Sequence, residues 1–313
     1  MMRNILSKFK SNYRTWRYNY GHNIKYYNFW IDQRPEEMWL SIFIRKHFPK
    51  ANNKRININS VLGPEWMIKD NRKGVNIFYT GENLHAQRFD HLTECLNKSH
   101  FDLYVGFDKS EEQNHIRIPI WLMWCFPPEG DITAINEIVR KMRFPKIDNK
   151  REFCCMVSSH DWSGLRGEIM DNMQRLGAVS SAGAFRHNTD ALQKEFGDDK
   201  VSFMSNYKFA ICPENMDTEG YVTEKIFDAI LAGCIPIYNG SNNKPEPEII
   251  NHDSIVFWET NKDNSLAVNK IIDIIMSDDC YREFASQPRL KKHAEDYVVE
   301  MYHSLKRSLS SIL

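Results

Sequence analysis

Short apolar runs alternate along the chain with segments whose apolar residues recur at helical spacing. In the first half, NIKYYNFWI (23–31), GVNIFYTGEN (74–83) and FDLYVGFD (101–108) predict strands, and PEEMWLSIFIRKHF (35–48) predicts a helix after the first of them. Alternation of strands with helices is typical of proteins built on parallel sheets. The hydrophobic pattern therefore predicts an α/β fold.

The second half repeats this alternation. FCCMVSS, NYKFAIC, CIPIYNG and SIVFW predict strands, while GLRGEIMDNMQRLG and TEKIFDAILAG predict helices that end at Gly177 and Gly233. Glycine is common just after a helix because it adopts the left-handed conformation at little steric cost. Apolar residues at helical spacing near the C-terminus predict a further packing helix; they are Val298, Met301, Tyr302, Leu305 and Leu309.

A polar and basic stretch, Lys141–Glu152, separates the two halves and predicts a crossing between two domains. We expect a basic N-terminal tail at 1–22, one domain at 23–148, a second domain at 149–288, and the C-terminal packing helix at 289–313. A chain of 313 residues is long enough for two such domains, each with its own core.

Composition narrows the class of protein. The chain is 42% hydrophobic and 26% charged, and its formal net charge is zero, so we expect a soluble protein with no nucleic acid partner. No stretch approaches the roughly 20 apolar residues of a membrane-spanning helix. The seven cysteines form no C-x-x-C pair and several lie in apolar runs. This predicts buried free thiols and a cytoplasmic location, with disulfides as the less favoured alternative.

The N-terminal segment differs in composition from the rest. It holds six lysine or arginine residues and no acidic residue before Asp32, and it lacks the apolar core of a signal peptide. We expect a solvated tail or an irregular first segment. Weak contact with an anionic membrane surface is the minor alternative.

Two cations, Arg166 and Lys225, stand where helices of the second half are predicted to begin. The positive end of a helix dipole disfavours a cation by up to about 1 kcal/mol, whereas a bound phosphate reverses the sign. Both helices follow predicted strands, whose carboxyl ends bind ligands in open α/β sheets, so the two cations can clamp a diphosphate. The alternative, which spacing alone slightly favours, is that they point outward and pair with acids such as Glu219 or Glu168.

Three neighbours of Lys225 also have two interpretations each. Glu224 can accept hydrogen bonds from a ribose diol, or it can simply stabilise the positive end of its helix. Tyr221 can pack against a base or a sugar, or it can belong to the core. Thr223 can be a plain N-cap.

The segment FAICPENMDTEGYVTEKIFDAILAGCIPIYNGS, Phe209–Ser241, resembles the donor-binding signature of the α-1,3/1,4-fucosyltransferases. That signature is a strand, an E-N pair, a short spacer, Y-V-T-E-K, a helix, and an A-G-x-x-P-I/V-x-x-G strand. NIFYTGEN, Asn76–Asn83, resembles a second block of the family, and GLRGE around Arg166 resembles a third, weaker one. Their order and rough spacing agree, so the resemblance covers about residues 23–290.

The resemblance implies a glycosyltransferase of the GT-B type, in which two Rossmann-like domains face a cleft. The amino domain would bind the acceptor, the carboxyl domain would bind GDP-fucose, and transfer would invert the anomeric carbon. Carried over onto this sequence, Arg166 and Lys225 would contact the diphosphate, while Asn215, Tyr221 and Glu224 would line the nucleotide-sugar site.

The resemblance also implies a general base, Glu82 of the T-G-E-N loop. An inverting transfer needs one carboxylate to take the proton of the acceptor hydroxyl. The alternative, which the residues alone favour, is that Glu82 caps the next helix. Arg166 and Lys225 supply positive charge for the phosphate leaving group, and no D-x-D motif is present. We therefore expect no required cofactor and no metal site, with a divalent metal at most stimulatory.

Together these features predict an α-1,3-fucosyltransferase that moves fucose from GDP-fucose to a GlcNAc hydroxyl of an N-acetyllactosamine or Lewis-type glycan. Pro213 stands where relatives often carry an aromatic residue, so a different GDP- or UDP-sugar donor is one alternative. A non-catalytic protein that binds glycans or nucleotide sugars is the other, and the presence of Glu82 disfavours it. The exact acceptor, the choice between α-1,3 and α-1,4 linkage, and the oligomeric state are left open.

Overall fold

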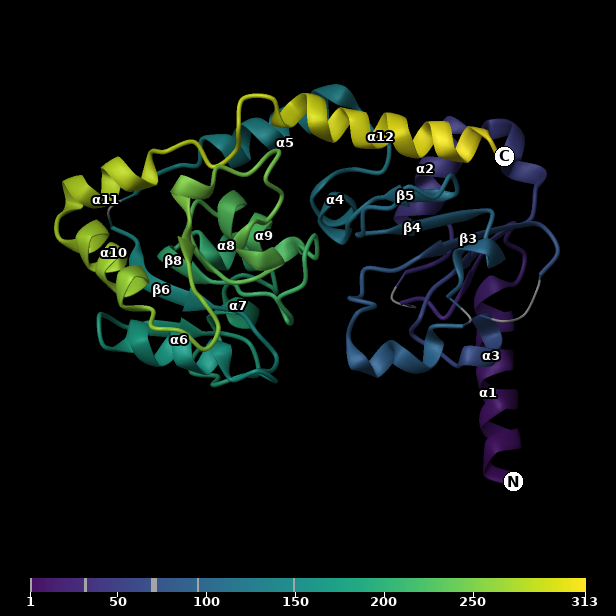
Figure 1. Cartoon of the computed structure of the whole chain (residues 1–313), viewed down its shortest axis with the longest axis horizontal. Coiled ribbons are helices and arrows are strands. Elements are labelled where there is room, and N and C mark those ends of the chain that lie inside the picture. The colour runs from purple at the N-terminus through teal and green to yellow at the C-terminus, as the bar shows by residue number, and fades with distance from the viewer. Residues whose placement is uncertain (1, 31–32, 69–71, 95, 149) are drawn as a thin grey trace. The chain divides into compact units, whose positions relative to one another are not determined.

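The computed structural model describes residues 2–30, 33–68, 72–94, 96–148 and 150–313, with the backbone alone for residues 2–10 (Figure 1). The end of the first predicted strand at Ile31, the thiol of Cys95 and the predicted domain start at Asn149 lie outside the described residues. The chain forms two compact units, Met1–Asp131 with Val299–Leu313, and Ile132–Val298.

The first unit is built on a parallel sheet of five described strands that lie side by side in chain order. The strands are β1 (Ile24–Tyr27), β2 (Ile56–Asn59), β3 (Val75–Tyr79), β4 (Leu103–Gly106) and β5 (His115–Arg117). The helical segments between and after them are α2 (Trp39–His47), η1 (Pro49–Asn53), α3 (Glu65–Ile68), η2 (Gln87–Leu92), η3 (Lys98–His100) and α4 (Ile120–Cys125).

The hydrophobic pattern did not predict β2. Two of its four residues are asparagines whose side chains are hydrogen-bonded inside the protein. Asn57 and Asn59 on β2 are buried, and the Asn57 side-chain amide donates to the Asn76 side-chain oxygen at 3.1 Å. The side-chain oxygen of Asn59 accepts from the Arg72 guanidinium at 3.1 Å. Buried polar side chains are tolerated when they are hydrogen-bonded in this way. The two asparagines interrupt the apolar run, so the sequence pattern does not reveal that β2 is a fully buried strand.

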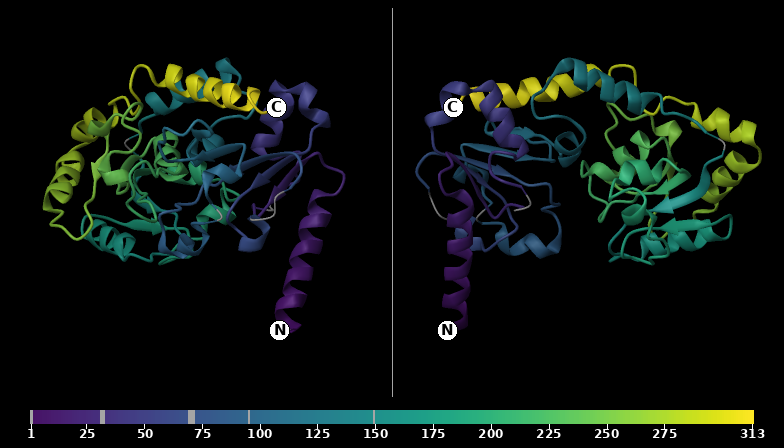
Figure 2. Two further views of the ribbon diagram at one scale, coloured as in Figure 1. Left: turned by 45° about the vertical axis from the view of Figure 1, so that its right-hand side comes forward. Right: turned by 180° about the vertical axis from the view of Figure 1, so that it is seen from behind.

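The first segment of the chain is a helix, α1 (Met2–Asn19), so the expectation of an irregular first segment is wrong. The end of α1 is tied to β1, because Asn19 both donates to the Tyr26 carbonyl at 2.8 Å and accepts from the Tyr26 backbone N–H at 2.7 Å. Figures 1 and 2 show α1 extending past the sheet of its own unit. No helix among the described residues is long and apolar enough to cross a membrane.

The second unit holds a second parallel sheet, with the spatial order β7-β6-β8-β9-β10. Its strands are β6 (Glu152–Met156), β7 (Val179–Ser181), β8 (Tyr207–Ile211), β9 (Ile235–Tyr238) and β10 (Val256–Phe257). Its helices are α5 (Ile132–Arg143), α6 (Leu165–Gln174), α7 (Ala191–Lys194), α8 (Lys200–Met204), α9 (Glu224–Leu231), α10 (Ser265–Ile275) and α11 (Asp278–Ala285), with short η4 (Ser241–Asn243) and η5 (His252–Ser254). This is a doubly wound order, in which the strand order reverses between β6 and β8.

The pattern also missed β5 and β7, which at three residues each are too short to show a period. It placed the other strands and the helices α2, α6 and α9 where the structure has them. The predicted crossing at Lys141–Glu152 begins in the last turn of α5 and ends at the first residue of β6, and both elements belong to the second unit. The boundaries predicted for the domains stay predictions.

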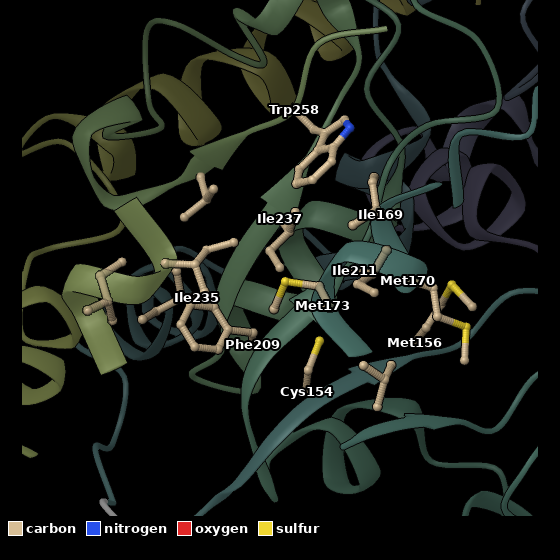
Figure 3. Close-up of a cluster of buried hydrophobic side chains, with 14 of the residues drawn as sticks. Cys154, Met156, Ile169, Met170, Met173, Phe209, Ile211, Ile235, Ile237 and Trp258 are labelled. Carbon is tan, nitrogen blue, oxygen red and sulfur yellow. The ribbon is translucent and has the colours of Figure 1, made fainter. Parts of the chain in front are cut away.

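The core of the second unit consists of rows of apolar side chains that run across the sheet. Cys154, Phe209 and Ile235 are register partners on β6, β8 and β9, and Ile169 and Met173 of α6 belong to the same buried cluster (Figure 3). The next row along the strands is the last before the loops; it is formed by Met156, Ile211 and Ile237. Because interiors are close-packed, these rows fix the points from which the following loops start.

The last helix, α12 (Ala294–Ser310), carries the five apolar residues of the predicted C-terminal helix, and all five are buried. Its first residues belong to the second unit and the rest to the first. In the first unit Tyr302 packs against Trp39 and Phe43, and its hydroxyl donates to the Pro127 carbonyl at 2.7 Å. These contacts hold α12 against α2.

The cysteines that the structure describes are free thiols, which confirms that prediction for six of the seven. Four of them are buried, while Cys125 and Cys280 are partly exposed. Burial raises the pKa of Cys154, Cys155 and Cys212 well above the ordinary value, so these side chains act as small apolar groups.

Candidate functional site

A pocket of about 190 Å³ lies in the second unit, where the strand order reverses. Its walls come from the segments after β6 and β8 and from α6, α8 and α9. The described lining residues are Val157, Ser158, Ser159, His160, Arg166, Lys200, Met204, Ile211, Cys212, Pro213, Asn215, Glu224, Lys225 and Asp228. Loops that leave neighbouring strands toward opposite faces of a parallel sheet open a crevice at such a point, and ligands bind there in open α/β proteins.

Arg166 joins the two loops that border the pocket. It is the second residue of α6, and only 5% of its surface is exposed. Its guanidinium donates to the His160 carbonyl at 2.6 Å in the segment after β6. It also donates to the Pro213 carbonyl at 3.2 Å and to the Asn215 side-chain oxygen at 2.8 Å in the segment after β8. The predicted alternative, an outward-pointing Arg166 paired with a surface acid, is not what the structure shows.

The charge of Arg166 is balanced inside the protein. Burial lowers the pKa of Arg166, and the negative charges of Asp161 and Glu214 act against this shift. The carboxylate of Asp161 accepts from the backbone N–H groups of Arg166 at 3.2 Å and Gly167 at 2.8 Å. These are among the first N–H groups of α6. Asp161 therefore pairs with the first N–H groups of α6. The positive charge that this helix contributes to the pocket wall is the guanidinium of Arg166.

Lys225 is held by a buried acid that the sequence analysis did not single out. Its ammonium lies 3.0 Å from Glu214 and 2.9 Å from the Thr223 hydroxyl. The Glu214 side chain is fully buried, whereas 26% of the Lys225 side chain is exposed. Burial lowers the pKa of Lys225, but the charges of Glu214 and Glu224 outweigh it and raise the pKa above the ordinary value. Lys225 is therefore a fixed cation in the pocket wall, not a partner of Glu219.

The Glu214 carboxylate accepts hydrogen bonds from residues of several segments. It accepts from the Thr223 backbone N–H at 2.7 Å and from the Thr223 hydroxyl at 2.7 Å. The Tyr238 hydroxyl on β9 donates to it at 3.4 Å. Thr223 occupies the N-cap position of α9, but its hydroxyl bonds Glu214 and makes no capping bond. A sequence signal existed, since Glu214 is an acid separated from the apolar strand β8 by only Cys212 and Pro213.

The other residues of the predicted nucleotide-sugar site separate into two groups. Asn215 and Glu224 line the pocket with Arg166 and Lys225. Tyr221 is buried, with 4% of its surface exposed, and is not one of the described lining residues. The structure thus brings four of the predicted residues to one pocket and places Tyr221 in the interior beside it. Their contacts with a nucleotide sugar stay predictions.

Two charged residues of the pocket wall were not predicted. Lys200 begins α8 and adds a third cation to the lining, and Asp228 of α9 adds an acid that is largely buried. Lys200 comes from a segment that shares no motif with Arg166 or Lys225, so only the packing of α8 against the pocket reveals it. Among the described residues, no group of three or more histidine, cysteine or acidic side chains could hold a metal ion.

Glu82, the predicted base, belongs to the first unit. It follows β3, its backbone N–H donates to the Thr80 hydroxyl at 3.1 Å, and its carboxylate is paired with the Arg88 guanidinium. The Glu82 side chain is 22% exposed. Ala86 holds the N-cap position of the next helical segment, η2, and that segment has no side-chain capping bond. Glu82 is therefore not a helix cap, and its carboxylate is partly accessible to solvent.

Comparison with solved structures defines the class of fold. A crystal structure of an α1,3-fucosyltransferase aligns with 91% of this chain and 89% of its own, with a TM-score of 0.62 and 20% sequence identity. A crystal structure of an α1,3-fucosyltransferase with GDP-fucose aligns with 90% of this chain and 89% of its own, with a TM-score of 0.58 and 19% identity. The chain has the fold of these glycosyltransferases, the GT-B fold.

Sequence comparison defines the family. The model of the C-terminal domain of glycosyltransferase family 10 (fucosyltransferase) matches residues 147–305, and the model of the α-(1,3)-fucosyltransferase FucT N-terminal domain matches residues 24–124. The chain therefore belongs to glycosyltransferase family 10, the fucosyltransferases. The α-(1,3)-fucosyltransferase FucT of Helicobacter pylori is 29% identical over 206 residues, which are 58% of this chain and 40% of that protein. The chain thus aligns with less than half the length of this relative.

The Glu214 network makes a testable prediction about stability. We expect Glu214→Gln to lower the free energy of unfolding by about 1–3 kcal/mol, because an amide offers one acceptor oxygen to donors that now share two and removes the carboxylate paired with Lys225. Urea unfolding followed by circular dichroism measures the difference.

The matched control is Glu219→Gln, in the same loop but exposed, which should change the unfolding free energy by less than about 0.5 kcal/mol. Equal stability of the Glu214→Gln variant and the unmodified protein would show that the buried carboxylate does not hold this part of the fold.

Proposed function

We propose that this protein is an inverting α-1,3-fucosyltransferase. In this reaction the hydroxyl of a GlcNAc residue in an N-acetyllactosamine or Lewis-type glycan attacks the anomeric carbon of fucose in GDP-fucose. The carbon–oxygen bond to the β-phosphate breaks and its electron pair stays on that phosphate. The hydroxyl proton passes to Glu82. The products are the fucosylated glycan and GDP.

The observation that carries this proposal is the placement of two internally held cations at the reversal point of the second sheet. Arg166 and Lys225 line one pocket, and each is held in place by hydrogen bonds inside the protein. Charges that are already oriented stabilise a developing phosphate charge without further reorganisation. A GDP diphosphate in this pocket would meet two such charges, and Lys200 would add a third. No cofactor is needed in this scheme, and a divalent metal is at most stimulatory.

The remaining polar residues of the pocket suit a nucleotide sugar. Glu224 begins α9 and can accept from the ribose hydroxyls, and Asn215 presents its amide N–H groups while its oxygen is used by Arg166. Tyr221 lies buried close by in sequence, where it can support the wall of the site.

Glu82 is proposed as the base because an inverting transfer needs one carboxylate near the acceptor hydroxyl. In the structure its carboxylate is paired with the Arg88 guanidinium and is partly exposed. The hydroxyl of the acceptor would take the place of Arg88, or share the carboxylate with it. The α-1,3 linkage is proposed from the names of two relatives, which are α-1,3-fucosyltransferases, and the glycan acceptor is proposed from the family resemblance of the sequence.

One feature of the pocket favours a second candidate. Pro213 lines the wall, and a proline there leaves a different shape from the aromatic residue that the resemblance suggests. A family member with this wall could take another GDP- or UDP-sugar.

A cytoplasmic location is proposed because the described cysteines are free thiols, which persist in reducing compartments.

Binding of GDP tests the role of Lys225. We expect Lys225→Ala to weaken GDP binding by at least about tenfold, because a hydrogen bond to a charged group contributes about 1.5–3 kcal/mol. Isothermal titration calorimetry measures the affinity, and thermal unfolding of the same samples verifies that the variant is folded. Lys194→Ala, an exposed lysine of the same unit, is the control. An unchanged affinity for GDP would remove Lys225 from the diphosphate site.

Transfer tests the role of Glu82. We expect Glu82→Gln to keep GDP binding and to lose about 10²- to 10⁴-fold in transfer rate, because an amide cannot accept the acceptor proton. The control is Glu111→Gln, an exposed acid of the same unit, which should transfer normally. Normal turnover of the Glu82→Gln variant would reject Glu82 as the base.

A donor screen tests the function as a whole. The purified protein is incubated with GDP-fucose, GDP-mannose or UDP-galactose and with N-acetyllactosamine or its β-1,3 isomer, with and without a chelator. We expect product from GDP-fucose alone, and in the presence of chelator. Product from a different donor would support the second candidate, and GDP binding without any turnover or hydrolysis would indicate a non-catalytic binding protein.

A further inference from the structure

A row of exposed aromatic side chains runs along α1 to the residue directly after it. Tyr13, Trp16 and Tyr20 are 62%, 58% and 70% exposed. Their ring centroids are 6.0 Å and 5.2 Å apart along the row, because spacings of three and four residues return to one face of a helix. Single exposed aromatics are normal on a soluble protein, but a continuous row marks an interaction surface.

Positive charge accompanies this row. Arg14 and Arg17 on the same helix are exposed, and the sequence holds six basic residues and no acidic one before Asp32. The whole chain has a formal net charge of zero, so this concentration is local. An aromatic and basic helix face of this kind is complementary to a surface that is negatively charged and apolar just below its charges.

A second pocket adjoins the row. It has a volume of about 580 Å³ and lies where α1 meets β1, and its lining includes Trp16, Tyr20, Lys25 and Arg55. Among the described residues the Lys25 ammonium has no hydrogen bond or ion pair, and none of the described lining residues of the pocket is acidic. Burial lowers the pKa of Lys25, and the nearby positive charge of Arg55 lowers it further. Lys25 and Arg55 thus form a pair of like charges that an anion would stabilise.

Arg72 also borders this pocket but already has a structural role. Its guanidinium lies 3.7 Å above the Tyr27 ring and donates to the Met67 carbonyl at 2.7 Å and to Asn59 at 3.1 Å. It holds the pocket floor and adds to its positive potential. The two cations that an incoming anion can reach are therefore Lys25 and Arg55.

We propose that the aromatic row and the adjoining pocket together bind a membrane surface rich in anionic phospholipid. In this arrangement a lipid phosphate enters the pocket between Lys25 and Arg55, and the rings of Tyr13, Trp16 and Tyr20 lie at the level of the headgroups. Tyrosine and tryptophan are suited to that level, because their rings are apolar and their N–H or O–H groups reach water.

Two observations favour a membrane over an acidic oligosaccharide. Tyr13 belongs to the exposed row but not to the described pocket lining, so a sugar seated in the pocket leaves it without a contact. In addition, Arg14 and Arg17 are exposed on α1, which extends past the sheet of its unit (Figures 1 and 2), and neither is a described lining residue of the pocket. A projecting helix can reach into a headgroup layer over its length.

The test is sedimentation of the full chain with vesicles, which does not depend on transferase activity. We expect binding to vesicles of equal parts phosphatidylglycerol and phosphatidylcholine, weaker binding as salt rises, and little binding to phosphatidylcholine alone. Binding that is the same on both kinds of vesicle, or absent from both, overturns the proposal.

Variants locate the binding surface. Replacing Lys25 and Arg55 together by alanine should lower the partition coefficient about fivefold for each cation removed. The control, Lys46→Ala with Lys50→Ala, removes the same charge from exposed positions of the same unit and should have a smaller effect. Replacing the two rings, Trp16→Ala with Tyr20→Ala, should also weaken binding. Phe144→Ala, which removes an exposed aromatic elsewhere in the chain, should not.

For both the charge variants and the aromatic variants, equal losses in the site and control proteins overturn the assignment of the surface.

Two soluble probes separate other ligands. Glycerol phosphate and a sulfated oligosaccharide are titrated into the full chain without vesicles. Binding of either probe that depends on Lys25 and Arg55, combined with no binding to anionic vesicles, overturns the membrane proposal and assigns the pocket to a small anion or an acidic glycan. Circular dichroism spectra that match the unmodified protein verify that each variant is folded.

Discussion

The architecture of the pocket depends on the buried carboxylate of Glu214. A carboxylate removed from water is destabilising unless donors surround it, and Thr223 and Lys225 supply those donors. Glu214 follows β8, whereas Thr223 and Lys225 begin α9, so neutralising this one charge also joins the end of a strand to the start of a helix. Arg166 has the same effect from α6, because its guanidinium reaches the segments after β6 and β8.

Hydrogen bonds inside the protein orient both cations before a ligand binds. Lys225 and Arg166 are held at fixed positions before any anion arrives, which removes the cost of ordering two long side chains at the moment of binding. A phosphate bound beside them would share the cations with Glu214 and Asp161. Because these charges lie in a poorly solvated wall, their attraction for a phosphate is larger than that of surface lysines.

The first unit uses buried polar groups differently. Its strands lie side by side in chain order. The two asparagines of β2 are hydrogen-bonded to Asn76 and Arg72, and the Asn57–Asn76 bond holds the start of β3 against β2. The one acid to which we assign chemistry, Glu82, is partly exposed and paired with Arg88. A rigid cationic pocket in one unit and an accessible carboxylate in the other are the two components that the proposed transfer requires.

The amino-acid sequence by itself determined the α/β class, most strands, the helices that begin near Arg166 and Lys225, and the family signature, because these are features of residues close together in the chain. It misjudged the first segment, since α1 is tied to an edge strand by Asn19. It also misjudged the partners of the cations and overlooked Glu214. Arg166 reaches Asn215 across 49 positions, and that contact exists only because β6 and β8 pair in parallel and bring their carboxyl ends together. Such partnerships depend on tertiary packing, which no local pattern of residues records.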